Sequence, residues 1–286
     1  MKKNIFSFLL ILNIAMVSAQ TGPDMKVVYK KIDSVELSLH FFFPENYSTS
    51  DQNTAIVFFH GGGWKGGGPG HFYNQCNYFA SRGMVAISVQ YRTEQANNTG
   101  PIACVKDGKS ALRWIRSHAS DYGIDPNMIA AGGGSAGGHV AAASAVLLDF
   151  NEASDDMTIS PVPNALVLFN PVAHNGPEGY GYERVKDYWQ KFSPYHNLTK
   201  ETPPTLIMLG TEDKLFNGSL AEQYKQKMEN LGNRCDLILY EGQDHAFFNL
   251  DINEEMHFQT MKDADLFLTS LGFLKGAPTV DKFRRN

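Results

Sequence analysis

Short apolar runs recur along this chain and alternate with segments in which apolar residues return every three or four positions. The first pattern is typical of strands buried in a parallel sheet, and the second is typical of helices that pack on such a sheet. The expected strands are residues 36–43, 55–59, 84–89, 128–131, 165–169, 205–210 and 236–240, and the expected helices are residues 102–119, 220–231, 256–271 and one that begins at Ala136. Strands that alternate with helices predict an α/β fold class with a mostly parallel central sheet and helices on both faces.

The N-terminal residues show a different pattern, that of a signal peptide. Two lysines precede the apolar stretch 5–17, and small residues up to Ala19 fit a cleavage site. The apolar part is too short for an ordinary membrane span. We therefore expect residues 1–19 to be removed on export. Residues 20–286 would then form a single catalytic domain, secreted or periplasmic, with no membrane span.

Composition narrows the possible partners. A chain of 286 residues with 43% hydrophobic residues suffices for one α/β domain with a substantial core. The net charge is −5, and the charges do not cluster, so we expect no nucleic-acid partner. Cys76, Cys104 and Cys235 lack the spacing of metal ligands, so we expect no metal site, and we expect no cofactor. Cys104 belongs to an expected helix and should lie in the core, while disulfide pairing and oligomeric state stay open.

The most informative chemical signal is the segment 133–137, which reads Gly-Gly-Ser-Ala-Gly and matches G-x-S-x-G. In this motif a serine occupies a strained turn between a strand and a helix, and its hydroxyl is exposed beside the positive end of the helix. Ser135 is therefore the candidate nucleophile. The segment also fits the dinucleotide-binding pattern G-x-G-x-x-G. Several strands precede it, however, and the acidic residues about 20 positions later lie in a loop, so the nucleophile is favoured.

A second glycine-rich motif follows the expected strand 55–59. The sequence His-Gly-Gly-Gly-Trp at residues 60–64 resembles the loop that supplies backbone N–H groups to an oxyanion. Together with the N–H of Ala136, these glycines could stabilise a tetrahedral intermediate, and each such donor lowers the barrier by about 3 kcal/mol. His60 is expected to shape the loop rather than to act as a base.

A carboxylate and a histidine follow Ser135 in the required order, each just beyond an expected strand. Asp213 follows the strand 205–210 and is the preferred acid, with the longer Glu212 as its competitor. His245 follows the strand 236–240 and is the candidate base. Asp244 is a poor orienting group because adjacent residues of an extended loop point apart. Asp213 could instead cap the helix that starts near residue 219, and His245 could be an ordinary loop histidine.

Seven motifs together resemble the α/β-hydrolases of the hormone-sensitive-lipase-like and carboxylesterase group, in particular compact bacterial carbohydrate esterases such as acetylxylan and feruloyl esterases. They are HGGGW at 60–64, VQYR at 89–92, DGKSALRWIR at 107–116, YGIDP at 122–126, GGSAGGHVA at 133–141, PPTLIMLGTED at 203–213 and GQDHAFF at 242–248. The resemblance covers about residues 26–274. It implies a catalytic triad of Ser135, Asp213 and His245, and an oxyanion hole built from the N–H groups of Gly62, Gly63 and Ala136.

The substrate is indicated by the segment 171–196, whose tyrosines and tryptophan are interrupted by glycines and charges. A lipase lid needs a continuous apolar face, so this mixture favours stacking on sugars, although the aromatics could simply pack the loop onto the domain. Trp64 is expected to wall a small acyl pocket, and Tyr180 and Trp189 to contact the substrate. We therefore predict an exported serine esterase that removes acetyl or other short acyl groups from plant or algal carbohydrate. The alternatives are a prolyl-oligopeptidase-like serine exopeptidase and a general carboxylesterase or lipase.

Overall fold

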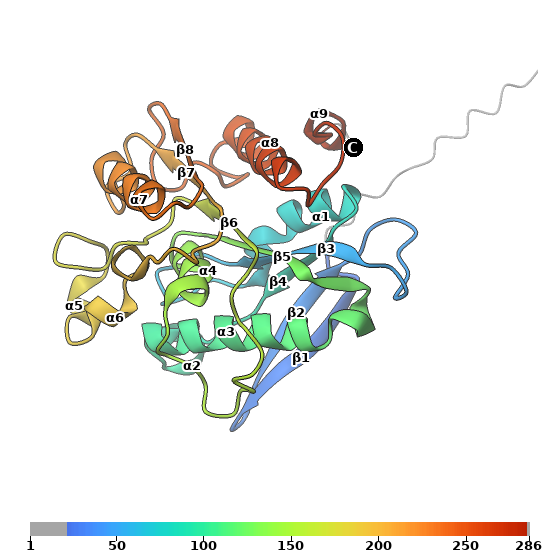
Figure 1. The fold of residues 1–286 in the computed structure, drawn as a ribbon, viewed down its shortest axis with the longest axis horizontal. Coiled ribbons are helices and arrows are strands. Elements are labelled where there is room, and N and C mark those ends of the chain that lie inside the picture. The colour runs from blue at the N-terminus through green and yellow to red at the C-terminus, as the bar shows by residue number, and fades with distance from the viewer. Residues whose placement is uncertain (1–21, 285–286) are drawn as a thin grey trace, which may run out of the picture.

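One central sheet organises the part of the chain that the structure describes. In this computed structural model the described residues are 22–284, so the expected signal peptide lies outside them. The strands are β1 (Met25–Ile32), β2 (Val35–Phe42), β3 (Asn53–Phe59), β4 (Val85–Val89), β5 (Ile124–Gly134), β6 (Ala165–Phe169), β7 (Thr205–Gly210) and β8 (Cys235–Tyr240). They form an eight-stranded sheet in the order β1-β2-β4-β3-β5-β6-β7-β8 (Figure 1).

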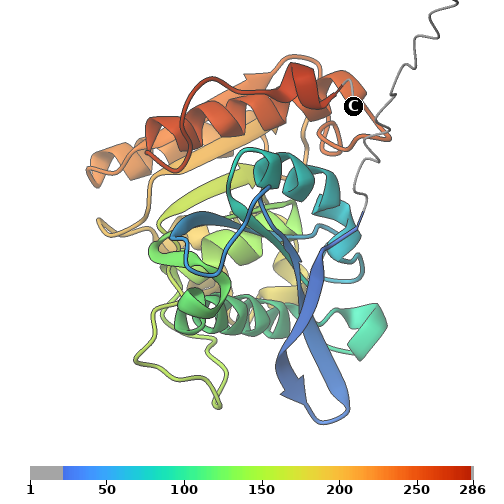
Figure 2. The same cartoon turned by 90° about the vertical axis from the view of Figure 1, so that its right-hand side faces the viewer.

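The sheet is mostly parallel, as the alternating pattern predicts. β1 and β2 form an antiparallel hairpin, and β2 also pairs antiparallel with β4. From β4 to β8 every neighbouring pair is parallel. The central strands are buried on both faces, which explains why their sequences are continuous apolar runs rather than alternating ones. The antiparallel hairpin lies at the edge of the sheet (Figure 2).

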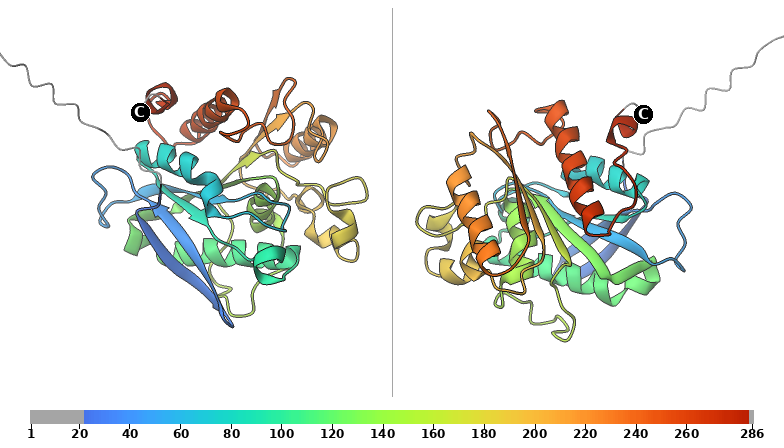
Figure 3. Two further views of the ribbon diagram at one scale, coloured as in Figure 1. Left: turned by 180° about the vertical axis from the view of Figure 1, so that it is seen from behind. Right: turned by 45° about the horizontal axis from the view of Figure 1, so that its top comes forward.

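Helices cover both faces of the sheet, and the predicted fold class is confirmed. They are α1 (Tyr73–Ser81), α2 (Glu94–Asn97), α3 (Pro101–Ser117), α4 (Ala136–Val146), α5 (Tyr182–Val185), α6 (Trp189–Phe192), α7 (Gly218–Asn230), α8 (Glu254–Ser270) and α9 (Val280–Phe283). Alternate residues of β3 belong to two separate cores. Ala55, Val57 and Phe59 belong to the core that also contains residues of α3, α4 and α7, whereas Ile56 and Phe58 belong to the core that contains residues of α1 and α8. Figures 2 and 3 show helices on both faces of the sheet. None of the helices within residues 22–284 has the length and apolar character that a membrane span requires.

The strands and long helices predicted from the sequence are confirmed within a few residues, but β1 and α1 were missed. β1 carries three lysines and is exposed over much of its length, so its pattern is not that of a buried strand. It is held by pairing with β2 rather than by its own composition. α1 mixes asparagine, glutamine and tyrosine with its buried positions, which hides its periodicity. All three cysteines are free and buried, and Cys104 lies in the core as expected.

The carboxyl ends of the parallel strands meet at one edge of the sheet, where open α/β sheets bind ligands. The loops after β3, β5, β6, β7 and β8 all begin at this edge. The short helices α2, α5 and α6 gather beside it, at the left in Figure 1. The residues singled out in the sequence follow these same strands, so the topology places them at a common edge.

Candidate active site

Ser135 occupies a strained turn between β5 and α4. Its backbone has φ 54° and ψ −119°, a conformation that costs a non-glycine residue about 1–3 kcal/mol. Neighbouring glycines make the turn possible, because a Cβ on Gly133 would lie 2.5 Å from the carbonyl oxygen of Phe59. The Ser135 N–H donates to the Phe169 carbonyl at 3.0 Å, which anchors the turn to β6. The side chain is thereby held at the strand edge and remains half-exposed.

The structure brings Ser135, His245 and Asp213 together in one hydrogen-bonded chain. The Ser135 Oγ lies 2.8 Å from His245 Nε2, and His245 Nδ1 lies 2.7 Å from Asp213 Oδ2. A carboxylate can only accept, so Nδ1 carries the proton and Nε2 is free to accept from the serine hydroxyl. The other oxygen of Asp213 accepts from the backbone N–H groups of Leu215 at 2.8 Å and Phe216 at 3.2 Å. Asp213 is therefore fixed in place as a buried acceptor for the imidazole.

The competing carboxylates lie elsewhere. Glu212 is exposed, and its backbone N–H donates to the Gln243 carbonyl at 2.9 Å. Asp244 is also exposed, and its carboxylate accepts from the N–H of Ala246 at 3.1 Å. The cap of α7 is Asn217, whose side chain accepts from a backbone N–H in the first turn at 3.1 Å. The alternative in which Asp213 caps this helix is thus wrong.

Asn170 is a member of the site that sequence reasoning missed. It follows β6 directly, is only 1% exposed and has φ 35°. Its Nδ2 lies 3.1 Å from His245 Nε2 and 3.4 Å from Nδ1, so the amide contacts the face of the ring, while the ring edge is engaged by Ser135 and Asp213. The available signal was its position, because it is a polar residue immediately after a buried strand at the edge where ligands bind.

The glycine loop, residues 60–68, approaches the same turn with an unusual backbone. Gly62, Gly63 and Trp64 have φ values of 121°, 64° and 61° in succession. The Gly62 carbonyl accepts from the N–H groups of Lys65 at 3.0 Å and Gly66 at 3.1 Å, which closes a tight turn. At the other side Ala136 is the first residue of α4, so its N–H has no acceptor within the helix.

Two histidines, His60 and His71, form hydrogen bonds with the backbone of Gly61 in the glycine loop. The ring of His60 is buried, stacks on Tyr91 with 4.0 Å between centroids, and bonds the Gly61 carbonyl through Nδ1 at 2.8 Å. The Nδ1 of His71 accepts from the Gly61 N–H at 3.0 Å, and its Nε2 bonds Asn249 at 2.6 Å. Burial lowers the pKa of His60 to about 4 and also lowers that of His71, so both rings are neutral near pH 7. His60 therefore has a structural position, and His71 joins the glycine loop to the loop that carries His245.

The residues expected to contact substrate belong to the cover segment, residues 171–196, except for Trp64. Trp64 is fully buried, with its ring against His139 and Phe192, so it presents no surface to an open pocket. The expectation that it walls an acyl pocket is not supported by this position. Tyr180 is half-buried with its hydroxyl directly over Gly63, at 2.6 Å from the place a Cβ would take there. Trp189 is half-buried within the cover segment, with its ring 4.8 Å from that of His196.

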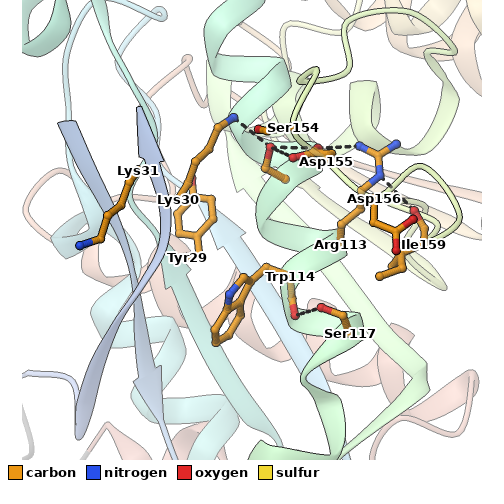
Figure 4. A pocket seen from close by; sticks show the side chains of 11 residues that line it. Tyr29, Lys30, Lys31, Arg113, Trp114, Ser117, Ser154, Asp155, Asp156 and Ile159 are labelled. Carbon is orange, nitrogen blue, oxygen red and sulfur yellow. Dashed lines mark hydrogen bonds and ion pairs between the residues drawn. The ribbon is translucent and has the colours of Figure 1, made fainter. Parts of the chain in front are cut away.

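A separate depression of about 260 Å³ lies against β1 and α3 and shares no residue with this site (Figure 4). Its charged side chains are paired with protein groups rather than free. Arg113 binds Asp155 at 3.0 Å, and Lys30 binds the fully buried Asp107 at 2.7 Å. These contacts satisfy the charges internally, so the depression has the character of a structural cluster.

Comparison with known proteins adds to this geometry. Residues 56–249 match the family described as the alpha/beta hydrolase fold. The chain is 29% identical over 307 residues to an acetylxylan esterase of Xylanibacter ruminicola, covering 99% of this chain and 57% of that protein. It is 28% identical over 191 residues to a probable carboxylic ester hydrolase of Mycobacterium tuberculosis, covering 57% of this chain and 42% of that protein. The chain thus spans about half the length of the curated relatives it matches.

A solved structure is similar over nearly its whole length. The apo form of Thermogutta terrifontis esterase 2 superposes with a TM-score of 0.85 at 40% sequence identity, covering 91% of this chain and 98% of that one. The same esterase has been solved with propionate bound and with butyrate bound.

Proposed function

We propose, from the premise that this chain belongs to the alpha/beta hydrolase family, that it is a serine esterase which removes short acyl groups from carbohydrate. Family membership bears out the resemblance seen in the motifs. The names of the relatives, which are carboxylic-ester hydrolases and esterases, support the predicted carboxylic-ester hydrolase class. The observation that carries the proposal is the chain Ser135–His245–Asp213, with separations of 2.8 and 2.7 Å, on a strained turn.

In the first half of the reaction, Ser135 Oγ attacks the ester carbonyl while its proton passes to His245 Nε2. Asp213 holds the imidazole in the tautomer that can accept this proton and stabilises the imidazolium that forms. The oxyanion is bound by the N–H of Ala136 and by those of Gly62 and Gly63. His245 then returns the proton to the alcohol oxygen as that C–O bond breaks, which leaves an acyl-serine and the free alcohol.

The second half reverses these roles with water. His245 Nε2 takes a proton from a water molecule whose oxygen attacks the acyl carbon, and the same N–H groups bind the second oxyanion. The proton returns to Ser135 Oγ as the acyl–oxygen bond breaks. The products are the carboxylic acid and the original enzyme, so the cycle is balanced without a metal or cofactor.

Two features favour a short acyl group on a sugar. The acetylxylan esterase relative and the propionate and butyrate complexes of the structural neighbour both concern small acyl groups. The cover segment adds half-exposed aromatic rings, Tyr180, Tyr182 and Trp189, among polar residues. Such rings offer faces on which a sugar can stack while its hydroxyl groups bond polar neighbours.

The test compares ester chain length with polymer deacetylation. The purified protein is assayed on p-nitrophenyl esters from acetate to decanoate, on acetylated xylan and on aminoacyl amides, with Ser135→Ala as the blank. We expect the highest kcat/KM on acetate and release of acetate from acetylated xylan but not from deacetylated xylan. Fast cleavage of octanoate and decanoate with no acetate from any acetylated glycan would contradict the substrate. Preference for aminoacyl amides would favour the exopeptidase.

We also propose that the protein is exported and is secreted or periplasmic. The support is the sequence of residues 1–19, with its basic start, apolar stretch and small-residue end. Expression of the full chain in a bacterial host and N-terminal sequencing of the extracytoplasmic protein should give a start at Gln20. Recovery of uncleaved protein in the cytosol or membrane fraction would contradict this proposal.

A further inference from the structure

We propose that Arg184, in the cover segment, is a positioning residue for the oxyanion hole, and that the cover segment is thereby part of the catalytic apparatus. This inference rests on the proposed esterase function. Arg184 Nη1 donates to the carbonyl oxygen of Gly63 at 2.6 Å, although the two residues are 121 positions apart in the sequence. Gly63 is one of the two glycines whose N–H groups would bind the oxyanion.

The glycine loop needs an external support because its backbone is unfavourable. Three successive residues, Gly62 to Trp64, have positive φ values, and Trp64 is not a glycine. A non-glycine residue is unfavourable in this left-handed region, because its Cβ lies too close to the following carbonyl oxygen. The directions of the Gly62 and Gly63 N–H groups depend on these dihedral angles. A loop that relaxed toward ordinary angles would turn the donors away from the carbonyl carbon under attack.

Contacts from two helices hold the loop in this conformation. From α2, the N–H of Glu94 donates to the Trp64 carbonyl at 3.2 Å, and the N–H of Gln95 donates to the Lys65 carbonyl at 2.8 Å. From α5, Arg184 holds Gly63, and its second guanidinium nitrogen, Nη2, lies 3.2 Å from the Glu94 carboxylate. The planar guanidinium thus spans the loop and joins α5 to α2. Its carbon also lies 5.4 Å from the ring centroid of Trp64.

A charged donor on the Gly63 carbonyl restrains the site through the backbone. It fixes the plane of the peptide that joins Gly63 to Trp64, since a peptide bond is rigid. The N–H of that peptide belongs to Trp64, so the restraint reaches the Gly63 N–H through the dihedral angles of Gly63, and it is strong because the donor is charged. Tyr180, also from the cover segment, lies against the Cα of the same glycine. Two residues of the cover segment therefore converge on Gly63.

The surroundings of Arg184 separate this role from a general contribution to folding. Its side chain is 25% exposed, and that of Glu94 is 52% exposed. An ion pair this accessible contributes little to stability, because water screens the charges and the side chains lose entropy when they pair. Loss of Arg184 should therefore leave the fold in place while it releases Gly63.

The experiment compares Arg184→Met and Arg184→Lys with the control Lys186→Met. Lys186→Met removes an exposed charge of the same cover segment, and that charge pairs with Glu183 at 3.8 Å. Each variant is assayed for kcat and KM on p-nitrophenyl acetate. Inhibition by an aryl trifluoromethyl ketone is also measured, because its serine adduct carries a negative oxygen in the oxyanion hole.

We expect Arg184→Met to lower kcat by about 10–100-fold, less than the loss of a whole oxyanion donor, with KM little changed. The inhibition constant of the ketone should rise by a similar factor, Arg184→Lys should recover part of both losses, and Lys186→Met should stay near wild type. An unchanged kcat in Arg184→Met, a rise in KM alone, or an equal loss in Lys186→Met would overturn the inference.

Two further observations keep this test separate from the proposed function. A wild-type protein without ester hydrolysis would refute the esterase, whereas an active wild type and an equally active Arg184→Met would refute only the role of Arg184. A crystal structure of Arg184→Met provides a readout that does not depend on activity. The Gly63 carbonyl should change direction in it, and an unchanged glycine loop would count against the inference. If Arg184→Met does not fold, Arg184→Lys carries the comparison against Lys186→Met.

Discussion

Two polar clusters in this protein each contain a buried aspartate, but they differ in how completely their polar groups are paired. In the ion-pair cluster of Lys30, Arg92, Asp107 and Glu152, the fully buried Asp107 has Lys30 Nζ at 2.7 Å and Arg92 Nη2 at 2.8 Å, while Glu152 accepts from both cations at 3.1 Å. Every charge there is neutralised within the protein. In the triad cluster the side chain of His245 is 24% exposed, and the half-exposed Ser135 lies in a strained turn.

The difference lies in what each cluster leaves unsatisfied. The charged groups of the ion-pair cluster are all paired with one another, so none is left to bind a ligand. The contribution of this cluster to stability depends on every partner, because removing one leaves a buried charge uncompensated. The triad cluster includes the half-exposed Ser135 and adjoins two groups without a full set of partners or a relaxed backbone: the first N–H of α4, which has no acceptor within its helix, and the strained glycine loop. Backbone strain of this kind is retained where the surroundings hold it, and it gathers at functional sites. Complete pairing of the polar groups is thus typical of the structural cluster, and incomplete pairing is typical of the candidate site.

The sharpest test applies one substitution, serine to alanine, once in the triad cluster and once at a neighbour of the ion-pair cluster. Ser135→Ala removes the nucleophile and should lower kcat by about 10⁶-fold with the melting temperature unchanged, because the hydroxyl is not needed for packing. Ser110 accepts from Lys30 Nζ at 2.9 Å, so Ser110→Ala should cost about 1 kcal/mol of stability without loss of kcat. Ester assays give kcat, and thermal melts give the change in stability. A Ser135→Ala enzyme that keeps a tenth of the wild-type kcat would refute the nucleophile.

Neutralising the triad carboxylate should have the next largest effect. Asp213→Asn replaces the acceptor 2.7 Å from His245 Nδ1 by an amide that can present a donor, which favours the wrong tautomer. We expect kcat to fall by about 10⁴-fold. The matched change Glu212→Gln alters an exposed side chain and should be nearly neutral. A crippled Glu212→Gln with a mild Asp213→Asn would mean that the wrong carboxylate was chosen.

The contrast between Asp213 and Glu212 also shows how much of the candidate site the sequence could predict. Buried strands are recognisable in the sequence as apolar runs. Ser135, Asp213 and His245 each follow such a run, and Ser135 also lies in a G-x-S-x-G motif. The sequence alone could therefore place all three residues at one edge of the sheet. Trp64 could not be placed, because whether an aromatic ring lines a pocket or enters the core depends on the dihedral angles of the loop beneath it. Arg184 meets Gly63 only through tertiary packing, for which no local pattern exists.

Removing a charge from the ion-pair cluster should act on stability alone. Asp107→Asn keeps the shape of the side chain but leaves Lys30 and Arg92 with only Glu152 to neutralise them. We expect a loss of about 3–5 kcal/mol in the free energy of unfolding. In a domain of this size the melting temperature should fall by about 10 °C. Denaturant titration measures the loss, and kcat well below the melting temperature should match wild type. A fall in kcat with unchanged stability would mean that the two clusters are coupled.

Acid should destabilise the protein through the neutral histidines packed beneath the candidate site. Burial lowers the pKa of His139 to about 3 and that of His60 to about 4, against 6.5 in the unfolded chain. Between pH 6.5 and pH 4 the unfolded chain therefore binds more protons, so the free energy of unfolding falls as the pH falls through this window. Denaturant titrations across this range measure the slope. His139→Gln should flatten it, and an unchanged slope would remove His139 as a contributor.

The smallest expected effect tests the contact that sequence reasoning missed. The amide nitrogen of Asn170 lies 3.1 Å from His245 Nε2 and 3.4 Å from Nδ1, against the face of the ring. In Asn170→Asp a buried carboxylate would take this place and stabilise the protonated imidazole, because an opposite charge at this distance favours the charged form. The acid limb of the profile of kcat/KM against pH should then move upward by about 1 unit. Asn170→Ser, which removes the contact without adding charge, should not show this upward shift. A uniform loss of kcat at every pH in both variants would instead assign Asn170 a purely structural role. It would then resemble the fully paired residues of the ion-pair cluster in function, although it lies beside the triad.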